Sequence, residues 1–297
     1  MDEPDLAALE HAVGEALATG DRSQLCVIGH GEISIVLGWP PAEPTTVCKR
    51  LPPFRDRAAF DAYRDVVLRY VDELRSAGLR VVDTEVRDTT RADGRVVGFH
   101  VQPLLPGSSL GTEILRATGA PGGHPIVPAV VDAVERVTTD RIGVDAQMSN
   151  WVWLDDEPWQ IDLTTPFLLD ASGRPAFDLA PFLGALPAVV RPVVRREMTK
   201  LVHRWTTPRG ALLDLAANLL KEELDDWLDP TLACINARVD PPITAAEAAR
   251  VHTEDRRLWP MLFRLEHANR WWQEHVRRRP FEFLLPEHTT YEERSRT

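Results

Sequence analysis

The spacing of hydrophobic residues changes at one short segment, Pro103–Ser109 (PLLPGSS), which contains two prolines and a glycine. Before this segment, short apolar runs bounded by turn residues predict β-strands. After it, apolar residues recur mainly at the spacing of helices. We therefore expect an α+β protein in which a small strand-rich part and a larger helical part are joined by a hinge.

The individual elements follow from the same patterns. Asp93-Gly94 predicts a tight hairpin turn, and Gly78 ends a long amphipathic helix. Helices are expected at 5–17, 54–77, 110–117 and 126–138 and over most of 176–279, and strands within 25–40, at 45–51, 80–86 and 96–102, and on both sides of a turn near 155–158. In the helix at 54–77 the apolar face consists of Phe60, Tyr63, Val67, Tyr70, Val71 and Leu74.

Composition argues against several classes of protein. The 297 residues are 44% hydrophobic, which can fill a substantial core, and the apolar runs are too short to cross a bilayer. The formal net charge of −11 argues against a general nucleic-acid binder. Three scattered cysteines without a CxxC pair suggest neither a disulfide framework nor a zinc cluster. We expect a soluble cytoplasmic protein without a membrane or nucleic-acid partner, and its oligomeric state stays open.

The segment IGVDAQMSN at 142–150, followed by WVWLDDEPWQID, allows two interpretations of Asp145, Asn150 and Asp162. The first is a β-hairpin with polar turns, because apolar runs lie on both sides of an Asp-Asp-Glu-Pro turn. The second is a metal–phosphate site. The spacing by itself leaves both interpretations open.

Two features earlier in the chain bear on that choice. Gly29–Ser34 (GHGEIS) lies between two predicted strands, and it fits a plain hairpin turn or a loop whose backbone approaches phosphate oxygens. Lys49, one of only three lysines, lies in the next predicted strand on the same face as Val47 and Leu51. A buried lysine needs an anion, whereas a lysine on an edge strand does not.

The order of these features resembles the protein-kinase-like fold, and more specifically its aminoglycoside and choline phosphotransferase branch. The matching features lie between roughly residues 25 and 170: a glycine-containing hairpin, a strand lysine, an acidic helix, a hinge, and an Asp, Asn and second Asp at the family's spacing. The resemblance implies a two-lobed fold with an N-lobe at 1–102, a hinge at 103–109 and a helical C-lobe at 110–297. It also implies ATP and Mg²⁺ as cofactors.

The resemblance further implies a role for each matching residue. Asp145 would be the catalytic base that accepts the proton of a substrate hydroxyl, and Asn150 and Asp162 would bind Mg²⁺. The remaining residues would bind the nucleotide: Gly29, His30, Gly31, Glu32, Ile33 and Ser34 over the phosphates, Lys49 on the α- and β-phosphates, and Gln102 and Leu104 at the adenine. The helix acid paired with Lys49 would be Asp65, with Asp61, Asp72 and Glu73 of the same helix as the alternatives.

Two departures from the family are visible. Gly143-Val144 precedes Asp145 where the branch usually has His-Gly, and the frequent glycine after Asp162 is absent. The implied activity is still an enzyme that transfers the γ-phosphoryl group of ATP to a hydroxyl of a small molecule. The acidic stretch 221–229 suits a cationic acceptor, or it is a solvated helix face. A pseudokinase or nucleotide-binding regulatory module, and an enzyme that transfers AMP, are the alternatives.

Overall fold

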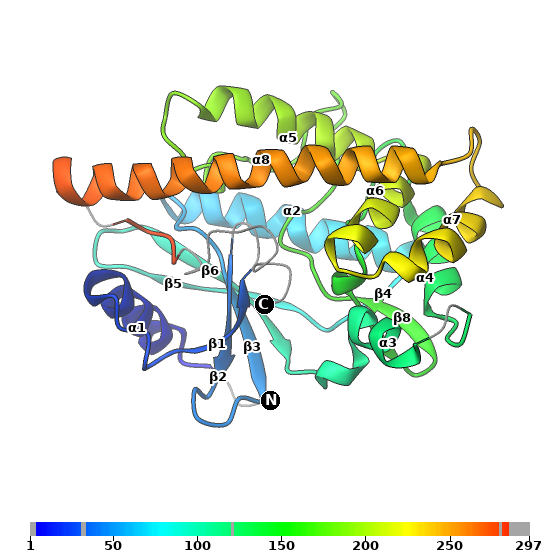
Figure 1. Ribbon diagram of the computed structural model, residues 1–297. Helices are drawn as coiled ribbons and strands as arrows, with labels where there is room; N and C mark the ends of the chain where they lie inside the picture. Colours follow the sequence, from blue (N-terminus) through cyan, green and yellow to red (C-terminus); the bar gives the residue numbers. More distant parts are fainter. Residues whose placement is uncertain (1–3, 31–33, 120–121, 279–280, 285–297) are drawn as a thin grey trace.

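The computed structural model describes residues 4–30, 34–119, 122–278 and 281–284 (Figure 1). The helices are α1 (Leu6–Thr19), α2 (Arg57–Ser76), α3 (Gly111–Thr118), α4 (Ile126–Val137), α5 (Arg191–Trp205), α6 (Pro208–Lys221), α7 (Leu228–Asn236) and α8 (Ala245–Trp271). The strands are β1 (Cys26–His30), β2 (Ile35–Trp39), β3 (Thr46–Arg50), β4 (Arg80–Val81), β5 (Glu85–Thr90), β6 (Val96–Pro103), β7 (Trp151–Leu154) and β8 (Glu157–Gln160). The protein is thus α+β, with most strands before Pro103 and most helices after it.

The larger sheet is antiparallel, and its strand order is β1-β2-β3-β6-β5. Residues of β3 alternate in burial, because successive side chains of a strand point to opposite faces. On one face, Cys48 forms a hydrophobic cluster with Leu9 and Val13 of α1 and with Phe99 of β6. Lys49 therefore points to the face of the sheet that α1 does not cover.

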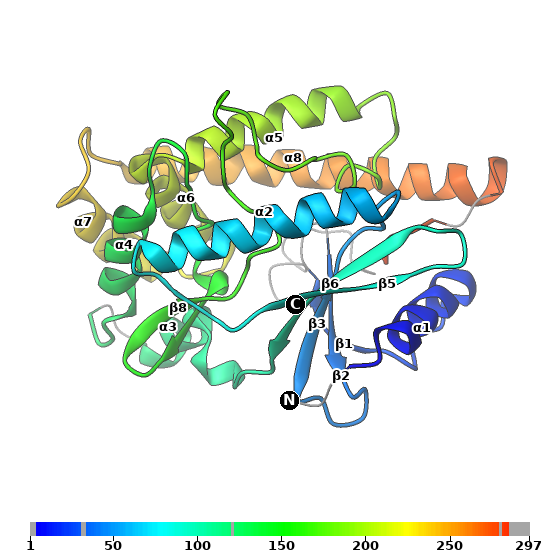
Figure 2. The same cartoon turned by 180° about the vertical axis from the view of Figure 1, so that it is seen from behind.

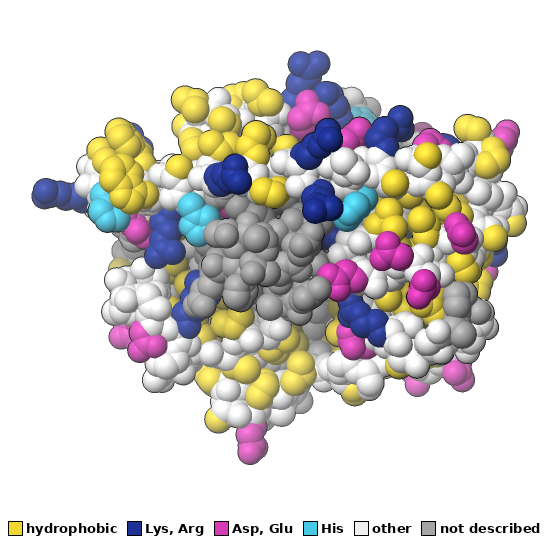
Figure 3. Space-filling view, in the orientation of Figure 1, with side chains coloured by type: hydrophobic (Ala, Val, Ile, Leu, Met, Phe, Trp, Pro, Cys, Tyr) yellow, Lys and Arg dark blue, Asp and Glu magenta, His cyan; other side chains and the backbone are white. Residues whose placement is uncertain are grey.

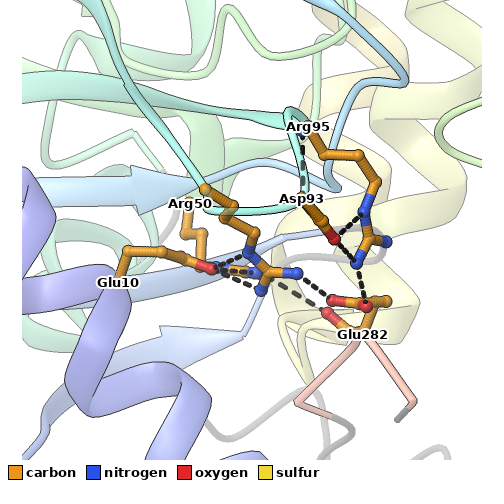
Figure 4. A network of polar contacts seen from close by, with 6 residues as sticks. Glu10, Arg50, Asp93, Arg95 and Glu282 are labelled. Atoms are coloured by element: carbon orange, nitrogen blue, oxygen red, sulfur yellow. Dashed lines mark hydrogen bonds and ion pairs between the residues drawn. The ribbon is translucent and has the colours of Figure 1, made fainter. Parts of the chain in front are cut away.

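A network of ionic side chains joins α1 to the sheet and to the described segment after α8 (Figure 4). Arg50 donates to both carboxylate oxygens of Glu10, at 2.7 and 3.0 Å, and Arg91 also donates to Glu10 at 2.8 Å. Glu282 accepts from Arg95 at 2.7 Å and pairs with Arg91. Burial by itself raises the pKa of Glu10, but Arg50 and Arg91 outweigh this effect and hold the pKa below its ordinary value.

The helix α2 matches its predicted face. All six of the predicted apolar residues are buried: Phe60, Tyr63, Val67, Tyr70, Val71 and Leu74. The Asp56 side chain accepts from the Ala59 amide at 2.8 Å and caps the first turn of the helix. The prediction of this helix and of its buried face is confirmed.

The strand predicted at 80–86 is wrong in one respect, because it divides between two sheets. Arg80–Val81 pairs in parallel with β8, and Glu85–Thr90 pairs with β6 in the larger sheet. Thr84 donates its hydroxyl to the Val82 carbonyl at 2.7 Å, which stabilises the turn between the two strands. The chain therefore connects the larger sheet to the β7–β8 hairpin at this point.

The helical prediction for 176–279 is wrong at its start, since regular helix begins only at Arg191. Pro181 and Pro187 interrupt the segment before it, because proline cannot donate a backbone hydrogen bond inside a helix. Farther on, α6 is buried along most of its length. It contacts α4, α5, α7 and α8, so it forms the centre of the helical part.

Figures 1 and 2 show how these parts are arranged. The larger sheet and α1 occupy one end of the molecule, α3, α4, α6 and α7 occupy the other, and α8 extends along the length of the molecule. The segment Pro103–Ser109 connects β6 to α3. Within the described ranges, no helix has the length and hydrophobicity that a membrane span requires.

Candidate functional site

The central contact of the site is an ion pair between Lys49 of β3 and Asp162, two residues after β8. The Lys49 Nζ lies 2.7 Å from the Asp162 Oδ2. The two side chains are 14% and 26% exposed, respectively. Asp162 thus supplies the anion that the buried ammonium of Lys49 requires. The ion pair also connects the larger sheet to the segment after the β7–β8 hairpin.

The Asp162 carboxylate is held in its charged form. Its Oδ1 accepts from the Thr164 amide at 3.0 Å and from the Thr164 hydroxyl at 2.7 Å. Burial alone raises the pKa of Asp162, but Lys49 and the two hydrogen bonds from Thr164 outweigh burial and lower the pKa to about 2. At neutral pH this carboxylate is an anion that can bind a divalent cation.

A buried histidine and tyrosine lie beside the ion pair. His100 of β6 is opposite Lys49 in the β3–β6 register, so the two side chains are on the same face of the sheet. The Tyr63 hydroxyl lies 3.0 Å from the His100 Nε2 and donates to the Thr164 carbonyl at 2.9 Å. A carbonyl can only accept, so the Tyr63 proton is directed to Thr164 and His100 donates from Nε2 to Tyr63.

This arrangement keeps His100 neutral and connects α2 to the Asp162 segment. Burial, together with the Lys49 ammonium, lowers the pKa of His100 to about 3 despite the opposite effect of Asp162. Burial also raises the pKa of Tyr63, so its hydroxyl remains a donor. The sequence patterns placed Tyr63 on the apolar face of α2 and His100 in a strand as part of the scaffold, and they did not place either residue in the site.

The predicted pairing of Asp65 with Lys49 is wrong in this structure. The Asp65 side chain is 73% exposed and lies 4.0 Å from Arg64. Successive helix residues are about 100° apart around the axis, so Asp65 lies on the side opposite to Tyr63, which is buried. The carboxylate partner of Lys49 is Asp162 instead.

The segment from Asp145 to Asp162 contains a real hairpin, because β7 and β8 pair in antiparallel register from Trp151 and Gln160 onward. The Asp145 carboxylate is half-buried and accepts from the Gln147 amide at 3.3 Å and from the Gln147 side chain at 2.8 Å. Asn150 is 7% exposed, and its carbonyl accepts from the Ile161 amide at 3.0 Å. The open end of the hairpin therefore brings Asn150 next to Asp162.

Gln160 connects both ends of this segment, and the sequence interpretation missed it. It is fully buried, and its side-chain amide donates to the Asp145 carbonyl at 3.3 Å and to the Asp162 carbonyl at 3.4 Å. The available signal was a polar residue at the inner end of a predicted strand, two positions before Asp162. Gln160 keeps the two acidic residues at a fixed separation.

The donor set fits Mg²⁺. Asp162 supplies a carboxylate and Asn150 an amide oxygen, and Mg²⁺ commonly takes one or two protein ligands together with water and phosphate. The Asn150 side-chain nitrogen is buried and has no hydrogen-bond partner among the residues that the structure describes, so the amide group is not engaged in a complete network there. Among the described residues, no cluster of three or more His, Cys, Asp and Glu side chains is placed to bind a metal. A cation here would therefore depend on phosphate oxygens for its remaining ligands.

Gly143, the departure before Asp145, is required by close packing. A Cβ at this position would lie 2.4 Å from the Trp205 carbonyl oxygen, which is closer than van der Waals contact allows. The Tyr70 hydroxyl donates to the Gly143 carbonyl at 2.8 Å. The start of the Asp145 loop is therefore held against both α2 and the end of α5.

The predicted nucleotide contacts at the hinge are partly excluded. The Leu104 amide donates to the Thr45 carbonyl at 2.9 Å, so it is not available for adenine. The Gln102 side chain donates to the Thr84 hydroxyl and to the Ile161 carbonyl, both at 2.8 Å. Gln102 thus connects the hinge end of β6 to the hairpin that carries Asp162.

The predicted phosphate loop is described only at its ends. Gly29 and His30 end β1, and Ser34 precedes β2, so the predicted pair of strands is confirmed. Gly31, Glu32 and Ile33 lie outside the described residues. The Ser34 hydroxyl is buried and has no hydrogen-bond partner in the described part of the chain.

A family model described as "Family of unknown function (DUF6206)" matches residues 8–270, which include every described residue of the site above. A comparison with curated proteins gives no match.

Proposed function

Because the chain belongs to the DUF6206 family, whose function is unknown, we propose a function from the geometry of the site. We propose that the protein is a small-molecule kinase that transfers the γ-phosphoryl group of Mg·ATP to a hydroxyl group. The observation that carries this proposal is the ion pair of Lys49 with Asp162, with Asn150 held beside it. A strand lysine, a carboxylate and an amide are the groups that phosphoryl transfer uses to bind phosphates and metal.

The arrangement of the elements supports the proposal. In the sheet order β1-β2-β3-β6-β5, Lys49 lies on the central strand, α2 follows that strand, and Pro103–Ser109 leads from β6 into the helical part. This order resembles the protein-kinase-like fold and its aminoglycoside and choline phosphotransferase branch. We accordingly propose an N-lobe at 1–102, a hinge at 103–109 and a C-lobe at 110–297, with the nucleotide between the lobes.

Each of the remaining site residues then has a defined task in binding. Asn150 and Asp162 would hold Mg²⁺, which when bound offsets the charge of the nucleotide phosphates. Lys49 would exchange part of its contact with Asp162 for the α- and β-phosphates, and Gly29 to Ser34 would cover them. At the hinge, Leu105 carries the next amide after Leu104 and replaces it as the proposed adenine contact.

Asp145 would be the catalytic base. Its carboxylate is half-buried and already accepts from Gln147, so its orientation is defined before the acceptor binds. The acceptor hydroxyl would pass its proton to Asp145 while its oxygen forms a bond to the γ-phosphorus and the bond from that phosphorus to the bridging oxygen of ADP breaks. The products are a phosphate monoester and ADP.

The surface near the helical part is acidic. Figure 3 shows Asp and Glu side chains gathered on the right half of this face, over the region of α3 and α7. Glu223, Asp225 and Asp226 are exposed in the segment between α6 and α7. Such a surface attracts cations, so amine-bearing polyols belong in the first set of acceptors to be tested.

The first experiment measures nucleotide binding. Mg·ATP should raise the melting temperature of the wild type, because a ligand that binds only the folded state stabilises it. Lys49→Ala should lose most of this increase, whereas Lys200→Ala, at an exposed lysine paired with Glu197, should keep it. An equal increase for wild type and Lys49→Ala would remove Lys49 from the phosphate site.

The second experiment measures turnover with a panel of hydroxyl acceptors by ADP formation and by the intact mass of products and protein. Phosphorylation adds a phosphate to the acceptor, whereas AMP transfer adds a nucleotide and releases pyrophosphate. Asp145→Asn should keep Mg·ATP binding and lower kcat by about 10²-fold or more, the scale of a positioned acid–base group. Equal kcat for Asp145→Asn and wild type would exclude this mechanism, and nucleotide binding without any product would favour a pseudokinase.

A further inference from the structure

The loop that carries Asp145 and Asn150 is held near its Asn150 end by a residue from the distant helical part. The Ser149 amide donates to the Glu222 Oε1 at 3.0 Å. Glu222 is the residue at which α6 ends, and its side chain is buried, since the residue is only 5% exposed. One of the contacts that hold the loop between the two proposed functional residues thus comes from a carboxylate that lies far away in the sequence.

The backbone of Glu222 is fixed on two sides. Its amide donates to the Asn218 carbonyl at 2.8 Å, and its carbonyl accepts from the Arg116 guanidinium of α3 at 2.9 Å. The start of α3 also lies against the loop, because a Cβ at Gly111 would be 2.7 Å from the Met148 carbonyl oxygen. The hinge segment leads directly into α3, so hinge, α6 and loop meet around Glu222.

Burial of the second carboxyl oxygen of Glu222 is energetically unfavourable. The Glu222 Oε2 has no hydrogen-bond partner among the described residues, and burial raises the pKa of this group although hydrogen bonds from Ser149 oppose the effect. An unpaired buried oxygen destabilises the fold, and an apolar residue at the end of α6 would avoid that cost. The Glu222 side chain is therefore not explained by the stability of α6, but it is explained by the bond to the loop, because its Oε1 is the acceptor of the Ser149 amide.

We propose that Glu222 is the positioning residue of the loop from Asp145 to Asn150. It contacts neither metal nor substrate in this scheme, and it acts through the Ser149 amide on the residues at both ends of the loop. This inference rests on the proposed function for its effect on turnover, whereas its effect on the loop can be measured without any activity.

The test compares three variants. Glu222→Ala removes the acceptor, Glu222→Gln keeps an acceptor oxygen of the same reach, and Asp226→Ala removes an exposed acid from the neighbouring turn as a matched control. Hydrogen exchange of the peptide that covers 146–150 should become at least about tenfold faster in Glu222→Ala, because the Ser149 amide loses its partner. Exchange in Asp226→Ala should match wild type, and Glu222→Gln should stay within about threefold of wild type.

Turnover supplies the second readout at a temperature where each variant is folded. Glu222→Ala should lower kcat by about tenfold or more, since small displacements of positioned groups are costly, while KM for the acceptor changes by less than about threefold. Glu222→Gln should retain kcat within about threefold, and it carries the test by itself if Glu222→Ala does not fold. Wild-type exchange and kcat in folded Glu222→Ala, or a tenfold loss of kcat in folded Glu222→Gln, would overturn the proposal. Faster loop exchange together with an inactive wild type would instead refute the proposed function and leave the positioning role standing.

Discussion

The ion pair of Lys49 with Asp162 makes a prediction that does not depend on any activity. The pKa of Asp162 is about 2 in the folded protein rather than the ordinary 3.8, a difference worth about 2 kcal/mol of stability at neutral pH. Lys49 is the largest of the effects that lower this pKa, ahead of the two hydrogen bonds from Thr164. Exposed ion pairs contribute about 0–1 kcal/mol, and breaking a fully buried one costs about 3–5 kcal/mol. For side chains that are 14% and 26% exposed, we expect a coupling of about 2 kcal/mol.

The measurement is a double-mutant cycle by urea unfolding at pH 7. Lys49→Met keeps an apolar side chain of similar length, and Asp162→Asn keeps the acceptor oxygen for Thr164. The free energy lost in the double variant should be smaller than the sum of the single losses by about 2 kcal/mol. Lys200 and Glu197, an exposed pair 2.7 Å apart on α5, form the control cycle, whose coupling should stay below about 0.5 kcal/mol.

The pH dependence follows from the direction of the pKa change. Because the folded-state pKa of Asp162 is lowered, its contribution is complete above the ordinary pKa and disappears as the pH falls through about 2. The coupling should therefore be constant from pH 7 to about 5 and clearly smaller at pH 3. Additive losses at pH 7, within about 0.5 kcal/mol, would show that the two side chains do not interact in solution and would remove the basis of the proposed site.

Two further predictions test the packing around the site and the ionic network of Figure 4. Gly143→Ala should lower the unfolding free energy by about 2–3 kcal/mol in urea unfolding, because the new Cβ would meet the Trp205 carbonyl. Gly14→Ala in α1 is the control and should be neutral or stabilising, because no atom lies close to that position. Equal effects of the two substitutions on the unfolding free energy would contradict the close approach of Gly143 to Trp205. Glu10→Gln should lower the unfolding free energy by about 3 kcal/mol at pH 7, because the buried Arg50 loses its charged partner. Since the pKa of Glu10 is lowered in the folded state, this difference should shrink as the pH falls below the ordinary value of 4.5, and a difference that grows in acid would contradict the assignment.

Local patterns in the sequence were sufficient for most of the elements. The apolar stripe of α2 was predicted residue by residue, because helix periodicity depends only on near neighbours. The Asp93-Gly94 turn and the β7–β8 hairpin were predicted for the same reason, since their turn residues and alternation are local. The same helix periodicity could have excluded Asp65, which lies on the side of α2 opposite to its buried face.

The candidate site was predictable only as a set of residue types. The spacing of Asp145, Asn150 and Asp162 placed these residues around one hairpin. It could not show that the Gln160 side chain would donate to the Asp145 and Asp162 carbonyls, or that the Leu104 amide would donate to the Thr45 carbonyl. Hydrogen-bond partners of this kind depend on which backbone groups remain unpaired after the strands have formed. Which groups remain unpaired is decided only when the whole sheet has assembled.

The sequence by itself thus determined most of the elements of this protein, the buried face of α2 and the acidic and amide groups near the hairpin, because each follows from contacts within a few residues along the chain. Only the tertiary structure decided that Lys49 pairs with Asp162, that Glu222 holds the Ser149 amide, and that the strand expected at 80–86 divides between two sheets. These contacts join residues that are distant in the sequence, and they form where packing of the whole chain leaves a buried charge or amide that must find a partner.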